Sequence, residues 1–65
     1  MSKPVVVIHE DEKKNTFLVI KNVSDTLCDK QMYKEAAFFT SRALLARNSH
    51  ELIKIAENFV LISSE

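Results

Sequence analysis

Three side chains could serve as nucleophiles or soft metal ligands, namely Cys28, His9 and His50. A nucleophilic cysteine needs a base within hydrogen-bond reach and surroundings that stabilise the thiolate. Cys28 instead lies between Asp25 and Asp29, whose charges disfavour a thiolate, and it falls on an apolar helical stripe. We therefore expect Cys28 to be a buried structural residue.

The remaining candidates give no better case for catalysis. No two of Cys28, His9 and His50 show the CxxC or HxxxH spacing of a metal site. Glu10–Glu12 are acidic neighbours, but they precede two lysines in a polar stretch that suits a solvated turn. We expect no catalytic residues, no metal, no cofactor and no small-molecule substrate, and the sequence predicts that the chain is not an enzyme.

Glycine is absent from the sequence, and its absence excludes the common phosphate-binding loops. Glycine lets a backbone approach a phosphate closely and adopt a positive φ. Without it there is no P-loop, no dinucleotide fingerprint and no glycine-rich kinase loop. Two-residue type I′ hairpin turns are disfavoured for the same reason, so we expect longer turns.

The 65 residues suffice for a single small domain, expected over residues 1–65. A fold of this size buries only roughly 60% of the surface that its unfolded chain exposes, so it is marginal without a disulfide, a metal or a partner subunit. The single cysteine excludes an intrachain disulfide and, with no signal peptide, predicts a cytoplasmic location. The apolar run after Pro4 is too short to span a bilayer, and we expect no membrane association.

Nine basic and nine acidic residues cancel, which argues against generic binding to nucleic acid. A local patch of Lys34, Arg42 and Arg47 could still contact DNA or RNA. A small dimeric nucleic-acid-binding regulator is therefore the alternative function. It requires these three residues on one continuous face, without Glu35 or Glu51 between them.

Two apolar runs near the N-terminus have the composition of strands. Val5–Ile8 is β-branched throughout, and Pro4 fits at the start of a strand. Thr16–Ile20 is the second run, and the polar loop between the two predicts a β-hairpin. Asn15 is the residue best suited to a left-handed turn position.

Apolar residues beyond position 24 recur at the spacing of a long helix. This helix runs over about 24–47, capped by Ser24 or Asp25, or it breaks near Asp29 into two helices. Its apolar stripe comprises Cys28, Met32, Ala36, Phe39, Ala43 and Ala46, widened by Tyr33, Ala37 and Leu44.

Asn48 and Glu51 have the spacing of a capping box and start a further helix. Residues 59–62 form either the end of that helix or a short strand. The sequence therefore predicts an α+β fold, with an N-terminal β-hairpin followed by two α-helices and an optional short third strand at the C-terminus.

An all-α three-helix fold is the alternative, because Phe17, Ile20, Val23 and Leu27 also have helical spacing. Residues 33–36 followed by Ala43 and Leu44 resemble the second helix of a tetratricopeptide repeat, over about half of one repeat. The glycine of that pattern is missing, and Asn48 stands where its proline would be.

The strand-like runs do not alternate between apolar and polar residues, which indicates a sheet whose two faces both require cover. The helices can cover one face only. The other face must meet a second copy of the chain, another protein or the tail of the same chain. We therefore expect a homodimer or another small homo-oligomer.

The long helix also has an outward face with apolar residues. When Phe39 points inward, Phe38 and Leu45 point outward, flanked by Lys34 and Arg42. Aromatic residues beside arginine are typical of interface hot spots. We predict a protein interface at these four outward residues, on a small regulatory or inhibitory protein that binds a larger protein. By analogy of size, phage and mobile-element accessory proteins are of this kind.

Overall fold

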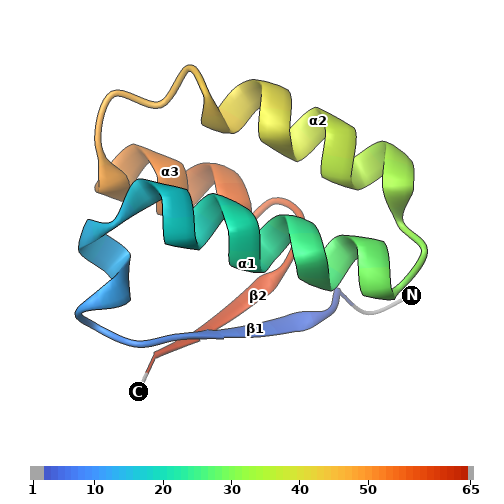
Figure 1. Cartoon of the computed structure of the whole chain (residues 1–65), viewed down its shortest axis with the longest axis horizontal. Helices are drawn as coiled ribbons and strands as arrows, with labels where there is room; N and C mark the ends of the chain where they lie inside the picture. The colour runs from blue at the N-terminus through green and yellow to red at the C-terminus, as the bar shows by residue number, and fades with distance from the viewer. Residues whose placement is uncertain (1–2, 65) are drawn as a thin grey trace.

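The computed structural model describes residues 3–64, and it contains a two-stranded sheet with three α-helices on one side (Figure 1). The predicted α+β class is confirmed, and of the two options for the C-terminal run the strand is present, at Leu61–Ser64. No helix within residues 3–64 is long and apolar enough to cross a membrane. The elements in chain order are β1 (Val5–Ile8), the 3-10 helix η1 (Glu12–Lys14), α1 (Thr16–Asp29), α2 (Tyr33–Ala43), α3 (Ser49–Ala56) and β2 (Leu61–Ser64).

The predicted β-hairpin is wrong, because Thr16–Ile20 forms the first turns of α1 and β1 pairs with the distant β2. Asn15 is the N-cap of α1, with an extended backbone at φ −100°. Its Oδ1 accepts hydrogen bonds from the backbone N–H groups of Phe17 at 3.1 Å and Leu18 at 3.3 Å. Asn15 therefore starts a helix instead of occupying a left-handed turn.

Helix α1 is amphipathic and explains why the strand prediction failed. Val19, Val23 and Leu27 are fully buried at intervals of four residues, which places all three on one helical face. Burial of this face outweighs the local β preference of the run. The helix that the all-α alternative predicted here is therefore present, while the predicted caps at Ser24 and Asp25 are wrong, since both lie inside α1.

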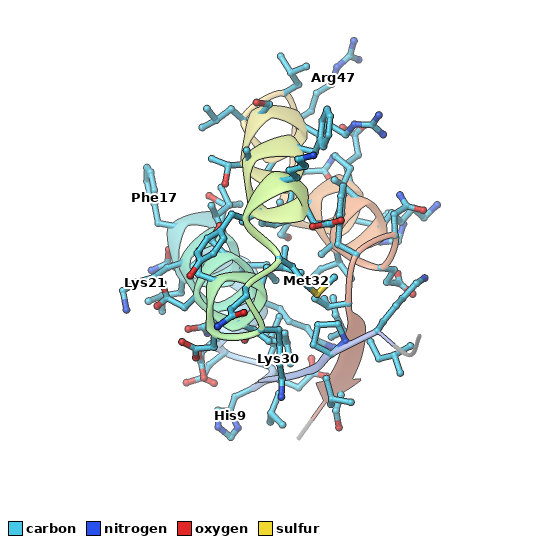
Figure 2. All side chains as sticks on the ribbon, turned by 90° about the vertical axis from the view of Figure 1, so that its right-hand side faces the viewer. His9, Phe17, Lys21, Lys30, Met32 and Arg47 are labelled. Atoms are coloured by element: carbon cyan, nitrogen blue, oxygen red, sulfur yellow. The ribbon has the colours of Figure 1, made fainter. Side chains whose placement is uncertain are left out.

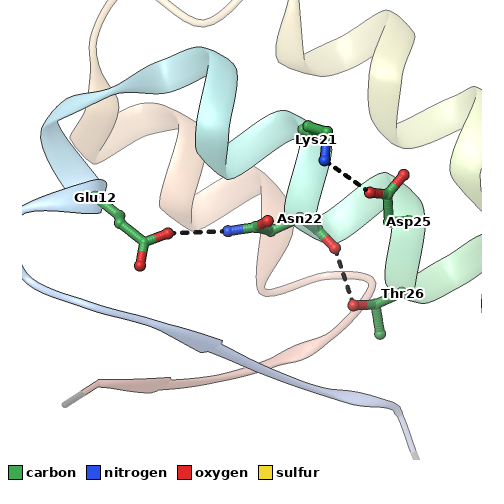
Figure 3. A network of polar contacts seen from close by, with 5 residues as sticks. All are labelled: Glu12, Lys21, Asn22, Asp25 and Thr26. Atoms are coloured by element: carbon green, nitrogen blue, oxygen red, sulfur yellow. Dashed lines mark hydrogen bonds and ion pairs between the residues drawn. The ribbon is translucent and has the colours of Figure 1, made fainter.

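Polar contacts attach the turn η1 to α1 (Figure 3). Asn22 donates a hydrogen bond from Nδ2 to Glu12 Oε2 at 3.2 Å. The backbone carbonyl of Asn22 accepts from Thr26 Oγ1 at 2.9 Å. The exposed ion pair between Lys21 and Asp25, at 3.4 Å, spans the same turn of α1. Of these contacts, the Asn22–Glu12 hydrogen bond joins η1 to the middle of α1.

The long helix of the prediction breaks in two, with Asp29 as the last residue of α1. Gln31 has a positive φ of 61°. The Met32 N–H donates to the Leu27 carbonyl at 2.8 Å, which is the closing bond of a Schellman motif. The N-cap position of α2 is Met32, which makes no side-chain cap bond.

The predicted apolar stripe is confirmed on α2 and fails at its margins. Ala36, Phe39 and Ala43 are buried, and the rings of Phe39 and Phe59 meet edge to face at 5.8 Å between centroids. The stripe residues Cys28, Tyr33, Ala37 and Leu44 are exposed instead. The buried core consists of Val6, Ile8, Val19, Val23, Leu27, Ala36, Phe39, Ala43, Leu52, Ala56 and Val60.

The predicted start of α3 is confirmed. Asn48 Oδ1 accepts from the Glu51 N–H at 2.9 Å. The Glu51 carboxylate accepts from the backbone N–H of Arg47, also at 2.9 Å, one residue before the N-cap. After α3 the chain turns, and the Leu61 N–H donates to the Pro4 carbonyl at 2.9 Å as β2 joins β1.

The two strands run parallel, with Val5 opposite Leu61 and Val7 opposite Ser63. These four residues form the outer sheet face, which points away from the helices, because side chains alternate along a strand. Val5, Val7 and Leu61 remain 59%, 46% and 52% exposed. The helices therefore cover only one face of the sheet, as predicted from the sequence, although only the first of the two strands predicted for the hairpin is present.

Candidate functional site

The four predicted interface residues share one side of α2 and the turn that follows it. We call Lys34, Phe38, Arg42 and Leu45 the α2 outer surface; they are spaced by four, four and three residues, and all are exposed. Phe38 is 62% exposed while its neighbour Phe39 is fully buried. The Leu45 N–H donates to the Arg42 carbonyl at 3.0 Å, so the backbone keeps turning beyond the helix end.

Positive charge is concentrated in the same part of the chain. Residues 33–47 contain three cations, Lys34, Arg42 and Arg47, and one carboxylate, Glu35, although the chain as a whole is neutral. Among residues 3–64, none of these three cations forms an ion pair. The cationic groups beside Phe38 are therefore available to an incoming anionic group.

A shallow apolar hollow of about 220 Å³ lies where the start of α1 meets the end of α2 and the α2–α3 loop, and none of the four residues of the α2 outer surface lines it. Phe17, Leu44 and Arg47 contribute to its lining. Phe17 and Leu44 are largely exposed, and Figure 2 shows Phe17 and Arg47 projecting from the body of the molecule. The hollow is open to an apolar side chain from another molecule.

Phe17 and Leu44 were not predicted to lie on the surface. Phe17 was expected in a strand, and Leu44 at the margin of the buried stripe. The signal for Phe17 was available in the all-α alternative, since a helix that buries Val19, Val23 and Leu27 turns Phe17 away from their line. For Leu44, no spacing pattern in the sequence indicated that the side chain would be exposed.

The residues that could do chemistry are dispersed. Cys28 is exposed, so its predicted burial is wrong: it lies one position past Leu27, on the flank of α1. His9 Nε2 lies 3.8 Å from Glu12 Oε1 on the surface. Over residues 3–64, no group of three or more His, Cys, Asp or Glu side chains could hold a metal ion, and no hydrogen bond or ion pair links Cys28 to His9 or His50.

An open groove of about 980 Å³ lies near the start of β1. Lys3, Lys30 and Glu35 contribute to it, and Lys3 donates to the Glu57 carbonyl at 3.0 Å. Small-molecule sites combine enclosure with a few convergent polar groups. No buried polar side chain occurs among the described residues, so the groove has only surface charges to offer a ligand.

The three residues of the predicted nucleic-acid patch lie in two segments of the chain, α2 and the loop that follows it. Lys34 and Arg42 share the α2 outer surface, but Arg47 lies in the loop, where its backbone N–H is bound by the Glu51 carboxylate. Glu35 is exposed on α2 next to Lys34. Carboxylates at both ends of the patch weaken its attraction for phosphate groups.

Comparisons of the chain with protein-family models, with curated proteins and with solved structures find no match. Function is therefore inferred from the chemistry of the exposed surfaces. Two of them carry large apolar side chains with no cover from the described chain: the α2 outer surface and the outer sheet face.

Proposed function

We propose that this chain is a small, non-catalytic regulatory or inhibitory protein that binds a larger protein through its α2 outer surface. The observation that carries the proposal is the contrast between Phe38, 62% exposed, and Phe39, fully buried. Burying a large apolar side chain contributes roughly 1.5–3 kcal/mol, and the fold does not use this contribution at Phe38. A partner that covers Phe38 and Leu45 gains it on binding.

The surface also suggests what the partner presents. Lys34 and Arg42 flank the apolar pair without ion-pair partners within residues 3–64, so the complementary surface offers carboxylates beside an apolar ridge. Such charges raise association rates and orient the encounter. The hollow beside Leu44 can accept one apolar side chain of that ridge.

The absence of catalysis is part of the proposal. Its support is that Cys28, His9 and His50 are not joined to one another by any contact among residues 3–64. The lone thiol of Cys28 fits a reducing compartment, and we propose a cytoplasmic location for the protein.

The test is quantitative affinity capture from the source cells with matched variants. Phe38→Ser and Leu45→Asp should each lose a protein that the parent chain retains, because each removes apolar contact from the α2 outer surface. Ser41→Ala is the control, since Ser41 is exposed on the same helix and outside the apolar pair.

Far-ultraviolet circular dichroism shows whether each variant keeps its helices. If folded Phe38→Ser and Leu45→Asp retain every protein that the parent retains, docking through α2 is wrong. Salt-sensitive retention of DNA or RNA in place of a protein would contradict the proposal as well.

A further inference from the structure

We propose that the outer sheet face is the contact surface of a homodimer, in which two copies stack these faces with their strands running in opposite directions. The interface consists of Val5, Val7, Leu61 and Ser63 with the same residues of the second copy. This proposal uses a surface separate from α2, so its failure and the failure of partner docking are distinguishable.

The centre of the outer sheet face has the chemistry of a sheet-packing interface. Val5 lies beside Leu61 and Val7 beside Ser63, and this four-residue patch contains no charged side chain. Sheets that pack face to face bury such residues at a separation of about 10 Å. Covering this face removes the exposed apolar side chains of Val5, Val7 and Leu61 from water, which favours association.

We propose that a second copy of the chain covers the outer sheet face, because dimer formation also stabilises a small fold. The sequence excludes an intrachain disulfide, and no metal-binding group of side chains occurs in residues 3–64. A partner subunit is a further source of stabilisation that small folds use. A second copy is present wherever the chain itself is made, and two-fold homodimers are the commonest oligomers.

Charges at the two ends of the sheet select one orientation. The groove at the start of β1 is lined by two lysines and one carboxylate, Lys3, Lys30 and Glu35, so positive charge prevails there. Residues 10–14, which follow the other end of the strand, contain three carboxylates and two lysines, so negative charge prevails there, and Asp11 is one of the three. Figure 2 shows His9 and Lys30 both directed toward the side of the molecule that carries the sheet. Neither Lys30 nor Asp11 forms an ion pair within residues 3–64.

A two-fold axis in the interface plane and perpendicular to the strands brings Lys30 of each copy toward Asp11 of the other. Stacking the strands in the same direction would instead bring Lys30 toward Lys30 of the second copy, and like charges in apposition oppose association. The antiparallel arrangement is therefore the self-complementary one.

The size of the face predicts a dimer that dissociates on dilution. The side of the molecule that carries the sheet measures about 27 by 15 Å between Cα atoms. This outline of about 400 Å² covers the whole side of the molecule and is an upper limit for the outer sheet face, yet it is smaller than the roughly 800 Å² that each partner buries in a standard stable complex. We expect the monomer–dimer transition at micromolar concentrations.

Sedimentation equilibrium over a concentration series tests the proposal. The parent chain should change from monomer to dimer, and Val7→Lys should raise the dissociation constant at least about a hundredfold, because it buries an unpaired charge. Phe38→Ser is the matched control, as it removes an exposed apolar side chain from the other surface and should leave the dimer intact.

Charge reversal tests the orientation without touching the sheet. Lys30→Glu and Asp11→Lys should each weaken the dimer about tenfold, and the double variant should restore it, because each exposed pair is contacted twice across the axis. These surface variants keep the proposal testable if Val7→Lys does not fold.

A parent chain that stays monomeric throughout, or a folded Val7→Lys that dimerises as the parent does, overturns the proposal. A double variant that stays weak overturns the antiparallel arrangement.

Discussion

The outer sheet face and the α2 outer surface are both apolar and uncovered, but they differ in where their charges lie. The sheet face is uncharged at its centre and has groups of opposite sign at its two ends, Asp11 and Lys30. On α2, two cations flank the apolar pair itself, Lys34 and Arg42. A surface with charges of opposite sign at its ends can complement a copy of itself, whereas a surface with cations alone opposes its copy and fits a different molecule.

Adjacent residues show the same division between folding and binding. Phe39 is fully buried and Phe38 is mostly exposed, and along β1 Ile8 is fully buried while Val7 is not. Residue type is similar within each pair, so the difference comes from the direction in which the backbone points the side chain. Substitutions at the inner residues should therefore change stability, and those at the outer residues should change association.

The largest expected effect is that of Phe39→Ala. Loss of this ring removes its contact with Phe59 and leaves a cavity in the core, which should lower the free energy of unfolding by about 3–5 kcal/mol. A domain of this length has a total stability of only about 3–10 kcal/mol, so the variant should be largely unfolded. Urea unfolding followed by circular dichroism at one fixed concentration measures this.

Phe38→Ala is the matched control, and its free energy of unfolding should stay within about 0.5 kcal/mol of the parent value. Equal destabilisation by the two substitutions would show that Phe38 belongs to the core, and the division between inner and outer residues would fail at α2.

Asn15→Ala should have the next largest effect. It removes the side-chain oxygen that accepts hydrogen bonds from two backbone N–H groups at the start of α1. Such substitutions lower the free energy of unfolding by about 0.5–2 kcal/mol. Because Asn15 lies on neither uncovered surface, the dimer dissociation constant measured under native conditions should not change. A loss of dimer in the folded variant would mean that the fold and the association are not separable.

Gln31→Gly should have a smaller effect of opposite sign. Gln31 holds a φ of 61°, a region that disfavours residues with a Cβ and suits glycine at this position of a Schellman motif. We expect a gain of up to about 1 kcal/mol in unfolding free energy. Thermal unfolding that shows the parent to be the more stable chain would contradict the left-handed geometry at this residue.

The double variant Lys34→Glu and Arg42→Glu should not change the dimer at all, although it should abolish docking of the larger partner. Its molar mass, measured by light scattering at the concentration where the parent is dimeric, is expected to equal that of the parent. A monomeric result would assign self-association to α2 and remove the contrast between the two surfaces.

The sequence predicted those parts of the fold that depend on local patterns. The start of α3 at Asn48, the strand Val5–Ile8 and the buried line through Ala36, Phe39 and Ala43 all follow from spacing and capping chemistry. The grouping of Lys34, Phe38, Arg42 and Leu45 on one side of α2 followed from the same helical spacing.

The pairing of β1 could not be predicted, because its partner strand begins at Leu61, beyond all three helices. A parallel pair needs a crossover connection, and local composition gives no register for it. The neighbouring run Thr16–Ile20 was a nearer candidate for the partner strand. It forms a helix because Asn15 caps its first turn and because the buried face of α1 packs against segments distant in the sequence. The apolar hollow was missed for the same reason, since it joins segments that the hairpin prediction kept apart.

The most direct test of the division between the two surfaces is the change in backbone amide chemical shifts on dilution of the isotopically labelled chain. If the outer sheet face forms the dimer, the changes are concentrated at residues 5–9 and 61–63, with smaller changes near Asp11 and Lys30 and none at Phe38 or Leu45. Changes confined to the α2 outer surface, or no changes over a concentration range that spans the micromolar region, would contradict it.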